Sequence, residues 1–223
     1  DVYRTIMRQK LLFMQAPTGV GKTISTIFPA VKAVGEELAD RIFYLTAKTI
    51  TATVAKETFA LLEKNGYRAK TIQITAKEKL CPCDEMECNP VTCPYAKGHF
   101  DRVNDAVFDL LHRCEMIERD DILSQADRYT VCPFELCLDT ASWCDNVICD
   151  YNYVFDPNVY LKRFFQEGIK GDYIFLIDEA HNMVERSRQM YSAQIYKEDF
   201  LTVKRIMKEH SRSIEKALEK CNK

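Results

Sequence analysis

Short apolar runs alternate with amphipathic stretches along most of this 223-residue chain. An apolar run at residues 10–15 ends in a turn rich in proline and glycine, which predicts a buried strand that leads into a loop. Similar runs predict further strands at residues 41–46, 70–75, 146–151 and 173–178. Helical spacing predicts helices at 22–39 and 49–64, and Pro29 should kink or break the first of them. Strands that alternate with helices predict an α/β fold, a parallel sheet with helices on both faces.

The alternation of strands and helices stops between Cys81 and Cys132, where cysteine and proline residues concentrate. A helical pattern at 100–111 lies within this stretch, and we interpret the stretch as an insertion. Near the end of the chain, apolar residues between 200 and 214 keep helical spacing and predict the start of a helical domain. The expected divisions are an α/β domain at 1–80, the insertion at 81–132, the rest of the α/β domain at 133–187, and the helical domain at 188–223.

The composition is that of an ordinary globular protein, with 47% hydrophobic and 29% charged residues and a formal net charge of -2. Nucleic-acid binding would therefore depend on local basic patches. The sequence has no run of about 20 apolar residues that could span a membrane, and no secretion signal at its start. We therefore expect a cytoplasmic protein without a membrane partner. Both ends are abrupt and the chain does not begin with methionine, so we expect it to be part of a longer protein.

Ten cysteines are many for a chain with no export signal, and seven of them lie between Cys81 and Cys137. In a reducing compartment, clustered thiols hold a metal more often than they form disulfides. An iron–sulfur cluster needs four thiolates that converge on one site, and one of them can come from far away in the sequence. The alternative is a local zinc site, although its Cys-x-Cys start fits the usual zinc spacing poorly. The zinc ligands would be Cys81, Cys83, Cys88 and Cys93.

The segment at 16–23, Ala-Pro-Thr-Gly-Val-Gly-Lys-Thr, follows a predicted strand and opens a predicted helix, which is the context of a phosphate-binding loop. Gly19 and Gly21 allow the tight turn that points successive backbone N–H groups at phosphates. Lys22 would contact the β- and γ-phosphates of ATP, and the Thr23 hydroxyl would be a ligand of Mg²⁺. The predicted nucleotide-binding residues are Thr18, Gly19, Val20, Gly21, Lys22 and Thr23, together with Asp178.

The segment at 173–181 is an apolar strand that ends in Asp-Glu-Ala-His. A buried parallel strand delivers the residues at its carboxyl end to the ligand crevice of an open α/β sheet. Asp178 would hold Mg²⁺ through water, and Glu179 would orient and deprotonate the attacking water. His181 would link the γ-phosphate to bound nucleic acid, so we predict Glu179, Lys22 and His181 as the catalytic residues. By itself the segment could be an ordinary acidic helix start, but the phosphate loop favours the catalytic interpretation.

These motifs, in this order, resemble the iron–sulfur helicases of superfamily two, the group that includes XPD and DinG. The phosphate loop begins with alanine, as is common in helicases. Phe-Tyr-Leu-Thr-Ala-Lys-Thr-Ile-Thr at 43–51 resembles a family motif that contacts the DNA strand. Cys-Pro-Phe-Glu at 132–135 and the segment at 147–157 resemble the return from the insertion to the motor. The resemblance implies a RecA-like motor domain with an iron–sulfur insertion, followed by a helical, arch-like domain.

The resemblance also implies an ATP-dependent DNA helicase that moves 5′ to 3′ and unwinds duplexes, with single-stranded DNA and DNA junctions as its partners. The family hydrolyses ATP between two motor domains, so this chain alone would turn over little ATP. The implied cofactors are ATP, Mg²⁺ and a [4Fe–4S] cluster. The family pattern selects four cluster ligands and leaves Cys83 aside. These ligands are Cys81, Cys88, Cys93 and Cys132.

Two other classes of function stay open at this point. One is a non-catalytic, metal-containing nucleic-acid-binding module with a vestigial nucleotide site, which the intact Lys22, Thr23 and Glu179 disfavour. The other is a different P-loop NTPase, such as a transporter or a GTPase, which Asp-Glu-Ala-His disfavours. Cations and aromatic residues alternate at 95–102, a mixture that grips single strands of DNA. A solvated helix face with buried aromatic rings is an equally acceptable interpretation of that cluster.

Overall fold

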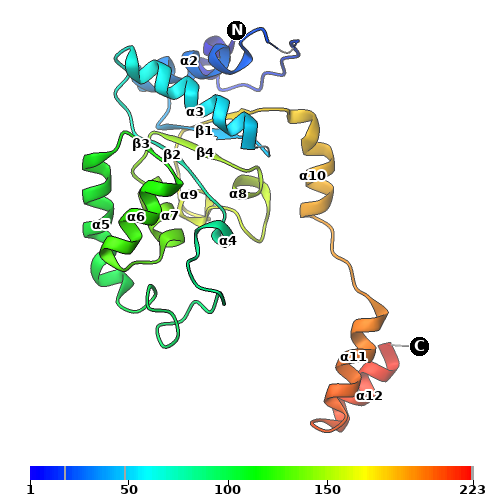
Figure 1. The fold of residues 1–223 in the computed structure, drawn as a ribbon. Coiled ribbons are helices and arrows are strands. Elements are labelled where there is room, and N and C mark those ends of the chain that lie inside the picture. Colours follow the sequence, from blue (N-terminus) through cyan, green and yellow to red (C-terminus); the bar gives the residue numbers. More distant parts are fainter. Residues whose placement is uncertain (18, 48, 222–223) are drawn as a thin grey trace. The chain divides into compact units, whose positions relative to one another are not determined.

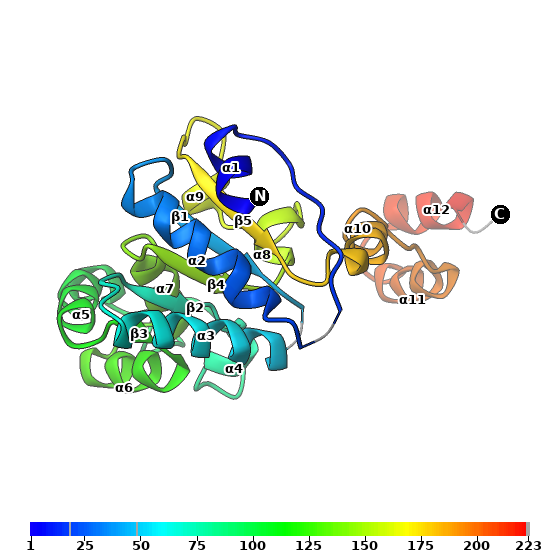
Figure 2. The ribbon, with the colours of Figure 1, turned by 90° about the horizontal axis from the view of Figure 1, so that it is seen from above.

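The computed structural model describes residues 1–17, 19–47 and 49–221. The chain divides into two compact units, Asp1–Met183 and Val184–Lys223. In the first unit, five described strands pair in parallel in the order β3-β2-β4-β1-β5 (Figures 1 and 2). Their bounds are Arg41–Leu45 for β1, Thr71–Gln73 for β2, Met116–Ile117 for β3, Asn146–Cys149 for β4 and Tyr173–Ile177 for β5. The predicted α/β fold with a parallel sheet is confirmed.

Helices cover both faces of this sheet (Figures 1 and 2). α2 (Lys22–Gly35) and α3 (Thr49–Lys64) lie on one face. α7 (Pro133–Ala141), α8 (Asn152–Phe155) and α9 (Lys162–Phe165) lie on the other. This arrangement buries β1 and β4 almost completely, as is usual for central strands of a parallel sheet. In β5, by contrast, Phe175 and Ile177 are exposed.

The strand β1 contributes to the core on both sides of the sheet, because successive side chains of a strand point to opposite faces. Ile42 and Tyr44 belong to the core under α2 and α3. That core also contains residues of both helices, among them Ile27, Ala30, Ala33, Ala52, Ala55 and Phe59. Phe43 points to the opposite face, where its ring centroid lies 5.2 Å from those of Phe164 and Phe165 in α9.

Two helices follow the sequence prediction closely. α3 covers residues 49–64 as predicted, and Gly66 follows it in a left-handed conformation with a φ angle of 99°. α2 begins at Lys22, also as predicted, but it continues through Pro29 and ends at Gly35. Proline removes one backbone hydrogen bond from a helix, and the buried face that α2 packs against the sheet outweighs that loss. Pro29 therefore does not end the helix.

The predicted strand at residues 10–15 is wrong. Residues 10–17 form no strand in the structure as described, and the side chains of Leu11 and Phe13 are 88% and 87% exposed. A strand is stable beside a partner whose backbone N–H and C=O groups it can bind. β5 pairs with β1 along one edge, and no described strand pairs with its other edge. The apolar run thus has a strand-like sequence but lacks a pairing partner among the described strands.

The cysteine-rich stretch adds two helices and one strand to the first unit. The helices are α5 (His99–Arg113) and α6 (Arg119–Tyr129), and a capping box begins α6. The short strand β3 lies between them and pairs with β2, so it extends the sheet. The expectation that strands stop between residues 81 and 132 is therefore wrong. Two residues are too few to produce a visible sequence pattern, although Ile117 is fully buried.

The second unit consists of helices. α10 (Met183–Met190) starts at the boundary between the units, and α11 (Lys197–Met207) and α12 (Arg212–Cys221) follow. α11 and α12 pack against each other, and Lys204 and Glu219 form an ion pair of 2.8 Å between them. The helical spacing seen at 200–214 is thus divided between two helices by a turn. None of the helices in the described ranges is long and apolar enough to cross a membrane.

Candidate nucleotide and metal sites

The phosphate loop adopts the tight turn that its glycines predict. Gly19 and Gly21 have φ angles of 82° and 79°, a left-handed conformation that residues with a side chain rarely adopt. Gly21 directly precedes α2, whose first residue is Lys22. Val20 is exposed between the two glycines, and Thr18 lies outside the described residues. The loop therefore presents its backbone at the start of a helix, as anion binding requires.

The Asp-Glu-Ala-His segment follows β5 at the carboxyl edge of the sheet. The N–H of Asp178 donates to the carbonyl of Leu45 at 3.0 Å, which continues the pairing of β5 with β1 by one residue. Glu179 has a φ angle of 51°, which turns the chain sharply out of the sheet and into the short helix Ala180–Asn182. Asp178 and Glu179 are both partly exposed where the strand ends.

The two nucleotide motifs meet although they lie far apart in the sequence. Nζ of Lys22 lies 3.9 Å from Oε1 of Glu179, with 39% and 30% of the two side chains exposed. The other oxygen of Glu179, Oε2, lies 3.5 Å from Nδ1 of His181. The three predicted catalytic residues therefore form one group at the end of the phosphate loop. All three are open enough to solvent for a ligand to reach them.

Two tyrosines that the sequence analysis did not single out contact these residues. The side chain of buried Tyr44, in β1, lies beside those of Asp178 and Thr23. Burial and the adjacent Asp178 carboxylate raise the pKa of Tyr44, so its hydroxyl keeps its proton. Tyr151, which follows β4 and is fully buried, donates its hydroxyl hydrogen to the backbone carbonyl of Asp178. The two predicted Mg²⁺ ligands, Thr23 and Asp178, thus share a buried neighbour.

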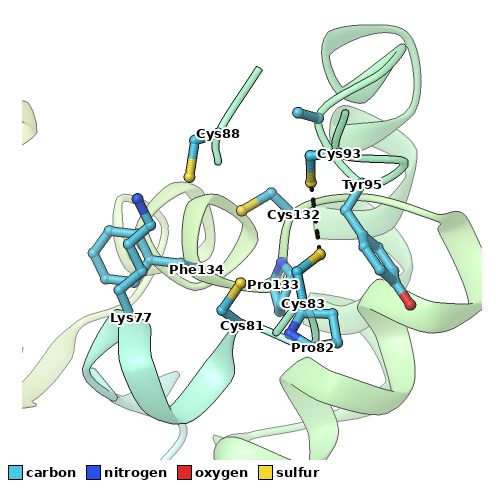
Figure 3. A pocket seen from close by; sticks show the side chains of 11 residues that line it. Lys77, Cys81, Pro82, Cys83, Cys88, Cys93, Tyr95, Cys132, Pro133 and Phe134 are labelled. Carbon is cyan, nitrogen blue, oxygen red and sulfur yellow. Dashed lines mark hydrogen bonds between the residues drawn. The ribbon is translucent and has the colours of Figure 1, made fainter. Parts of the chain in front are cut away.

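Five cysteines line one small cavity near α4 (Lys77–Leu80) and the start of α7 (Figure 3). Four of them are the cluster ligands that the resemblance implied. The fifth is Cys83, whose Sγ lies 4.0 Å from Sγ of Cys93. The sulfur atoms point toward a common space in Figure 3. The rest of the wall is mostly apolar and is formed by Pro82, Tyr95, Ala96, Pro133 and Phe134, with Lys77 as its cation.

Two thiols in this cavity, those of Cys83 and Cys132, have a raised pKa. Burial raises the pKa of Cys132, and burial together with the neighbouring Cys93 raises the pKa of Cys83. The pKa of Lys77 is raised, chiefly by the nearby thiol of Cys88. Thiols bind metal as thiolates, so a positively charged metal centre would reverse their preference for the neutral form. Within the described ranges, no three His, Cys, Asp or Glu side chains are close enough to hold a single metal ion.

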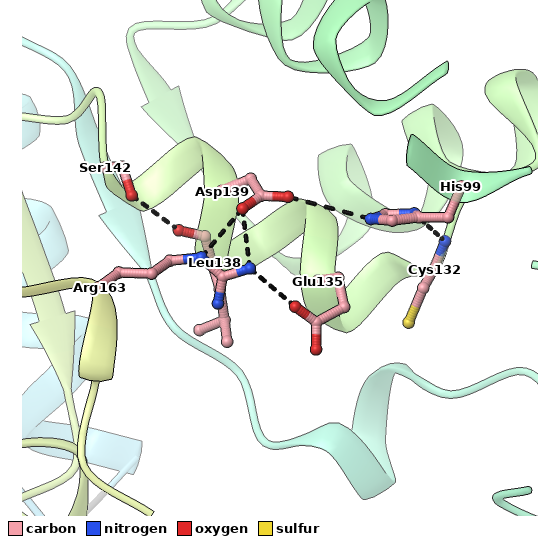
Figure 4. A network of polar contacts seen from close by, with 7 residues as sticks. All are labelled: His99, Cys132, Glu135, Leu138, Asp139, Ser142 and Arg163. Carbon is pink, nitrogen blue, oxygen red and sulfur yellow. Dashed lines mark hydrogen bonds and ion pairs between the residues drawn. The ribbon is translucent and has the colours of Figure 1, made fainter. Parts of the chain in front are cut away.

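A polar network leads from Cys132 to α9 (Figure 4). The N–H of Cys132 donates to Nδ1 of His99 at 3.2 Å, and His99 is only 4% exposed. Nε2 of His99 lies 3.9 Å from Oδ2 of Asp139, whose Oδ1 accepts from Nε of Arg163 at 2.9 Å. Arg163 also donates to Glu135 at 2.8 Å. Burial lowers the pKa of His99, against the opposing effect of the Asp139 carboxylate.

The fold divides the cluster of cations and aromatic residues at 95–102. His99 is buried, and the guanidinium of Arg102 donates to two backbone carbonyls just before Cys132. Both side chains therefore support the protein's own structure. Phe100, in contrast, is 86% exposed. Of these three side chains, Phe100 is the one placed to contact a ligand in solution.

Comparison with protein families assigns the chain to a known family. The DEAD_2 family model matches residues 52–200, which is more than half of the chain. The chain belongs to the DEAD_2 family. The matched range contains all the residues that line the cysteine cavity, and it includes the Asp-Glu-Ala-His turn. It contains no residue of the phosphate loop.

Two curated relatives of this DEAD_2 chain extend the comparison. The helicase subunit XPD/RAD3 of the general transcription and DNA repair factor IIH from Saccharomyces cerevisiae is 23% identical over 217 residues, which cover 82% of this chain and 28% of the relative. The Fanconi anemia group J protein homolog from Gallus gallus is 29% identical over 76 residues, which cover 34% of this chain and 6% of the relative. The DEAD_2 chain thus spans less than a third of the length of these relatives.

A solved structure of an XPD helicase matches the fold of this DEAD_2 chain. The TM-score is 0.61 at 16% sequence identity, and the match covers 99% of this chain and 38% of that chain. At this identity the match shows a shared fold. Together with the family assignment, it confirms the resemblance to the superfamily-two helicases of the XPD type.

Three residues in the sites of this DEAD_2 chain were not identified from the sequence, and a fourth, His99, was given another role. Their sequence positions could have indicated Tyr44 and Tyr151, because each places a hydroxyl at the carboxyl end of an apolar strand, where ligands bind in α/β sheets. No local sequence pattern could have indicated Arg163, since its carboxylate partners, Asp139 and Glu135, lie on another helix. His99 was noticed as a possible DNA contact, and its burial against the N–H of Cys132 depends on the tertiary fold.

Proposed function

We propose that this DEAD_2 chain forms the nucleotide-binding part of an ATP-dependent DNA helicase, which couples ATP hydrolysis to 5′ to 3′ movement on single-stranded DNA and to duplex unwinding. One observation carries the proposal. Nζ of Lys22, in the phosphate loop, lies 3.9 Å from the carboxylate of Glu179 in the Asp-Glu-Ala-His turn. A lysine that binds the γ-phosphate and a carboxylate that activates water must lie close together, because both act on the same phosphate.

Each residue of the nucleotide site has a defined task in this proposal. Lys22 binds the β- and γ-phosphates, assisted by backbone N–H groups of the loop. The Thr23 hydroxyl and the Asp178 carboxylate would hold Mg²⁺, which neutralises charge on the phosphate oxygens when it is bound. Glu179 orients the attacking water and accepts its proton. His181, 3.5 Å from Glu179, is placed to couple this carboxylate to bound nucleic acid.

We assign the cysteine cavity to a [4Fe–4S] cluster. The proposed ligands are Cys81, Cys88, Cys93 and Cys132. Four thiolates behind a mostly apolar wall suit such a cluster, and its positive metal centre would relieve the crowding of thiols in the cavity. A zinc site that uses Cys83 in place of Cys132 is the alternative. The position of Cys132 in the same cavity supports the cluster, because a local zinc site has no task for it.

Single-stranded DNA and DNA junctions are the proposed partners. The exposed ring of Phe100 offers a surface on which a base can stack. A helicase subunit of a DNA repair factor among the relatives supports a role in DNA repair. The ten free cysteines suit a reducing compartment such as the cytoplasm.

Replacing Lys22 tests the nucleotide site. Lys22→Ala removes the charge that binds the phosphates, so it should abolish DNA-stimulated ATP hydrolysis and strand separation by the protein that contains this chain, while DNA binding persists. Lys32→Ala is the matched control, because Lys32 lies on the same helix and makes a surface ion pair with Glu36 at 3.7 Å. ATP hydrolysis that survives Lys22→Ala would contradict the assigned site. A protein that binds DNA but hydrolyses no ATP with Lys22 intact would be the non-catalytic module.

A further inference from the structure

Side chains of the helix α5 form hydrogen bonds with the backbone on the amino side of Cys132. Arg102 donates to the carbonyls of residues 129–130 at 2.8 and 2.6 Å. One turn earlier on the same helix, Nδ1 of His99 accepts the N–H of Cys132 at 3.2 Å. On the carboxyl side, the N–H of Leu136 donates to the carbonyl of Cys132 at 2.9 Å as α7 begins. The backbone of Cys132 is therefore held on both sides by folded helices.

The direction of the hydrogen bond to Cys132 fixes the state of the His99 ring. A backbone N–H can only donate, so Nδ1 is the unprotonated acceptor nitrogen. The ring hydrogen then sits on Nε2, which faces Oδ2 of Asp139 at 3.9 Å. Asp139 therefore favours the tautomer that Cys132 requires. Carboxylates orient histidines in the same way around bound metals, where the histidine itself is the ligand.

Arg163 lies at the far end of this network from Cys132 (Figure 4). Its guanidinium spans two carboxylates, with Nε 2.9 Å from Oδ1 of Asp139 and Nη2 2.8 Å from Oε2 of Glu135. These carboxylates are four residues apart on α7 and so share one face of the helix. The two phenylalanines that follow Arg163 pack against the ring of Phe43 in β1. A continuous series of contacts thus runs from β1 to the N–H of Cys132.

We propose that His99 is a positioning residue for the iron–sulfur cluster. Through the N–H of Cys132 it holds this cysteine in place before the cluster binds, and Asp139 and Arg163 hold His99 in turn. The proposal rests on the cluster assigned above. Cys88, by contrast, is exposed on the segment between α4 and α5. Cys132 is therefore the prearranged ligand around which the cysteines between α4 and α5 assemble. Retention of the cluster then depends on residues that lie outside the segment between α4 and α5.

The rate of cluster loss measures this role in the anaerobically purified protein, when its visible absorption is followed after addition of excess iron chelator. His99→Phe keeps a ring but removes the acceptor, so it should speed the loss about 10- to 100-fold, the range seen when the partner of a metal ligand is removed. His99→Asn places a carbonyl oxygen near the position of Nδ1 and should stay close to the wild type. His99→Gln places its amide near Nε2 instead and should resemble His99→Phe. His112→Phe, on the exposed side of the same helix, is the matched control.

Hydrogen exchange at the Cys132 amide gives a second measurement, made by NMR on metal-free protein labelled at cysteine nitrogen. The wild type and His99→Asn should protect this N–H, whereas His99→Phe and His99→Gln should not. The Asn and Gln variants remove the same ring. Their comparison therefore shows whether an acceptor at the Nδ1 position holds the Cys132 N–H, even if His99→Phe does not fold. Equal rates of cluster loss in Asn and Gln, or equal exchange of the Cys132 amide, would overturn the proposal. Wild-type protein without iron would instead refute the cluster, and the exchange data would still decide whether His99 holds Cys132.

Discussion

The hydroxyl of Tyr151 donates a hydrogen bond to the backbone carbonyl of Asp178 and lies 3.4 Å from the carbonyl of Glu179. Tyr151 is fully buried and follows β4, whereas Asp178 follows β5. The Tyr151 side chain, which follows β4, therefore holds the peptide group between Asp178 and Glu179, where the chain leaves β5. The distance from Glu179 to Lys22 depends on that peptide group, because Glu179 is the next residue along the chain.

Tyr151→Phe should lower ATP turnover more than it lowers ATP affinity. The substitution keeps the buried ring and removes the hydroxyl, which frees the Asp178 carbonyl and lets Glu179 shift. A small displacement of a catalytic group costs on the order of 10-fold to 100-fold in rate. The loss of one buried hydrogen bond costs about 1 kcal/mol of stability. Steady-state ATPase kinetics of the protein that contains this chain measure the first effect, and thermal unfolding measures the second. An unchanged kcat with the same loss of stability would make Tyr151 a purely structural residue.

Glu179→Gln should separate ATP binding from ATP hydrolysis. The amide keeps the shape of the side chain but cannot accept the proton of the attacking water. Hydrolysis should fall by about 100-fold or more, the usual effect of losing a positioned general base. Binding of a fluorescent ATP analogue should change little. Glu57→Gln, on the exposed face of α3, serves as the control, and near-normal turnover by Glu179→Gln would remove this residue from its role.

The cluster assignment predicts which cysteines matter. Protein purified without oxygen should be brown and contain about four irons per chain. Replacement of any one proposed ligand by serine should bleach it, whereas Cys83→Ser and Cys114→Ser should not. The proposed ligands are Cys81, Cys88, Cys93 and Cys132. A colourless protein with one zinc, insensitive to Cys132→Ser and impaired by Cys83→Ser, would establish the zinc alternative.

Stability should fall at alkaline pH because of Cys137. Burial in α7 raises the pKa of this thiol from 9.0 to about 11. Between these values the unfolded chain loses the proton and the folded chain keeps it, so the free energy of unfolding decreases as pH rises. The decrease is on the order of 1–3 kcal/mol. Urea unfolding across this pH range should show a steeper decrease for the wild type than for Cys137→Ala, and equal slopes would contradict the assignment.

The sequence predicted those parts of the fold and site whose causes are local. The helix at 49–64 is one example, since its apolar spacing and the following Asn-Gly pair both lie within a few residues of it. The phosphate loop is another, because the left-handed turns at Gly19 and Gly21 need glycine whatever surrounds them. Both features are properties of short segments. The structure has the helix with its predicted bounds and both glycines in the left-handed conformation.

Features that depend on distant partners were beyond reach. The apolar run at 10–15 looks like a strand, yet strand formation requires a neighbouring backbone that no local pattern can supply. Arg102 and His99 look like part of a nucleic-acid-binding cluster, yet both bind the chain near Cys132. Their partners lie about thirty residues further along the sequence, and helix packing alone brings them together.

Glu179 occupies a backbone conformation that favours glycine, with a φ angle of 51°. A residue with a side chain gives up on the order of 1 kcal/mol there. Glycine at this position would therefore stabilise the folded protein and would at the same time remove the proposed catalytic base. Selection for stability and selection for ATP hydrolysis thus favour different residues at position 179. Among descendants that keep the fold but no longer hydrolyse ATP, position 179 is where drift toward glycine or asparagine should appear early.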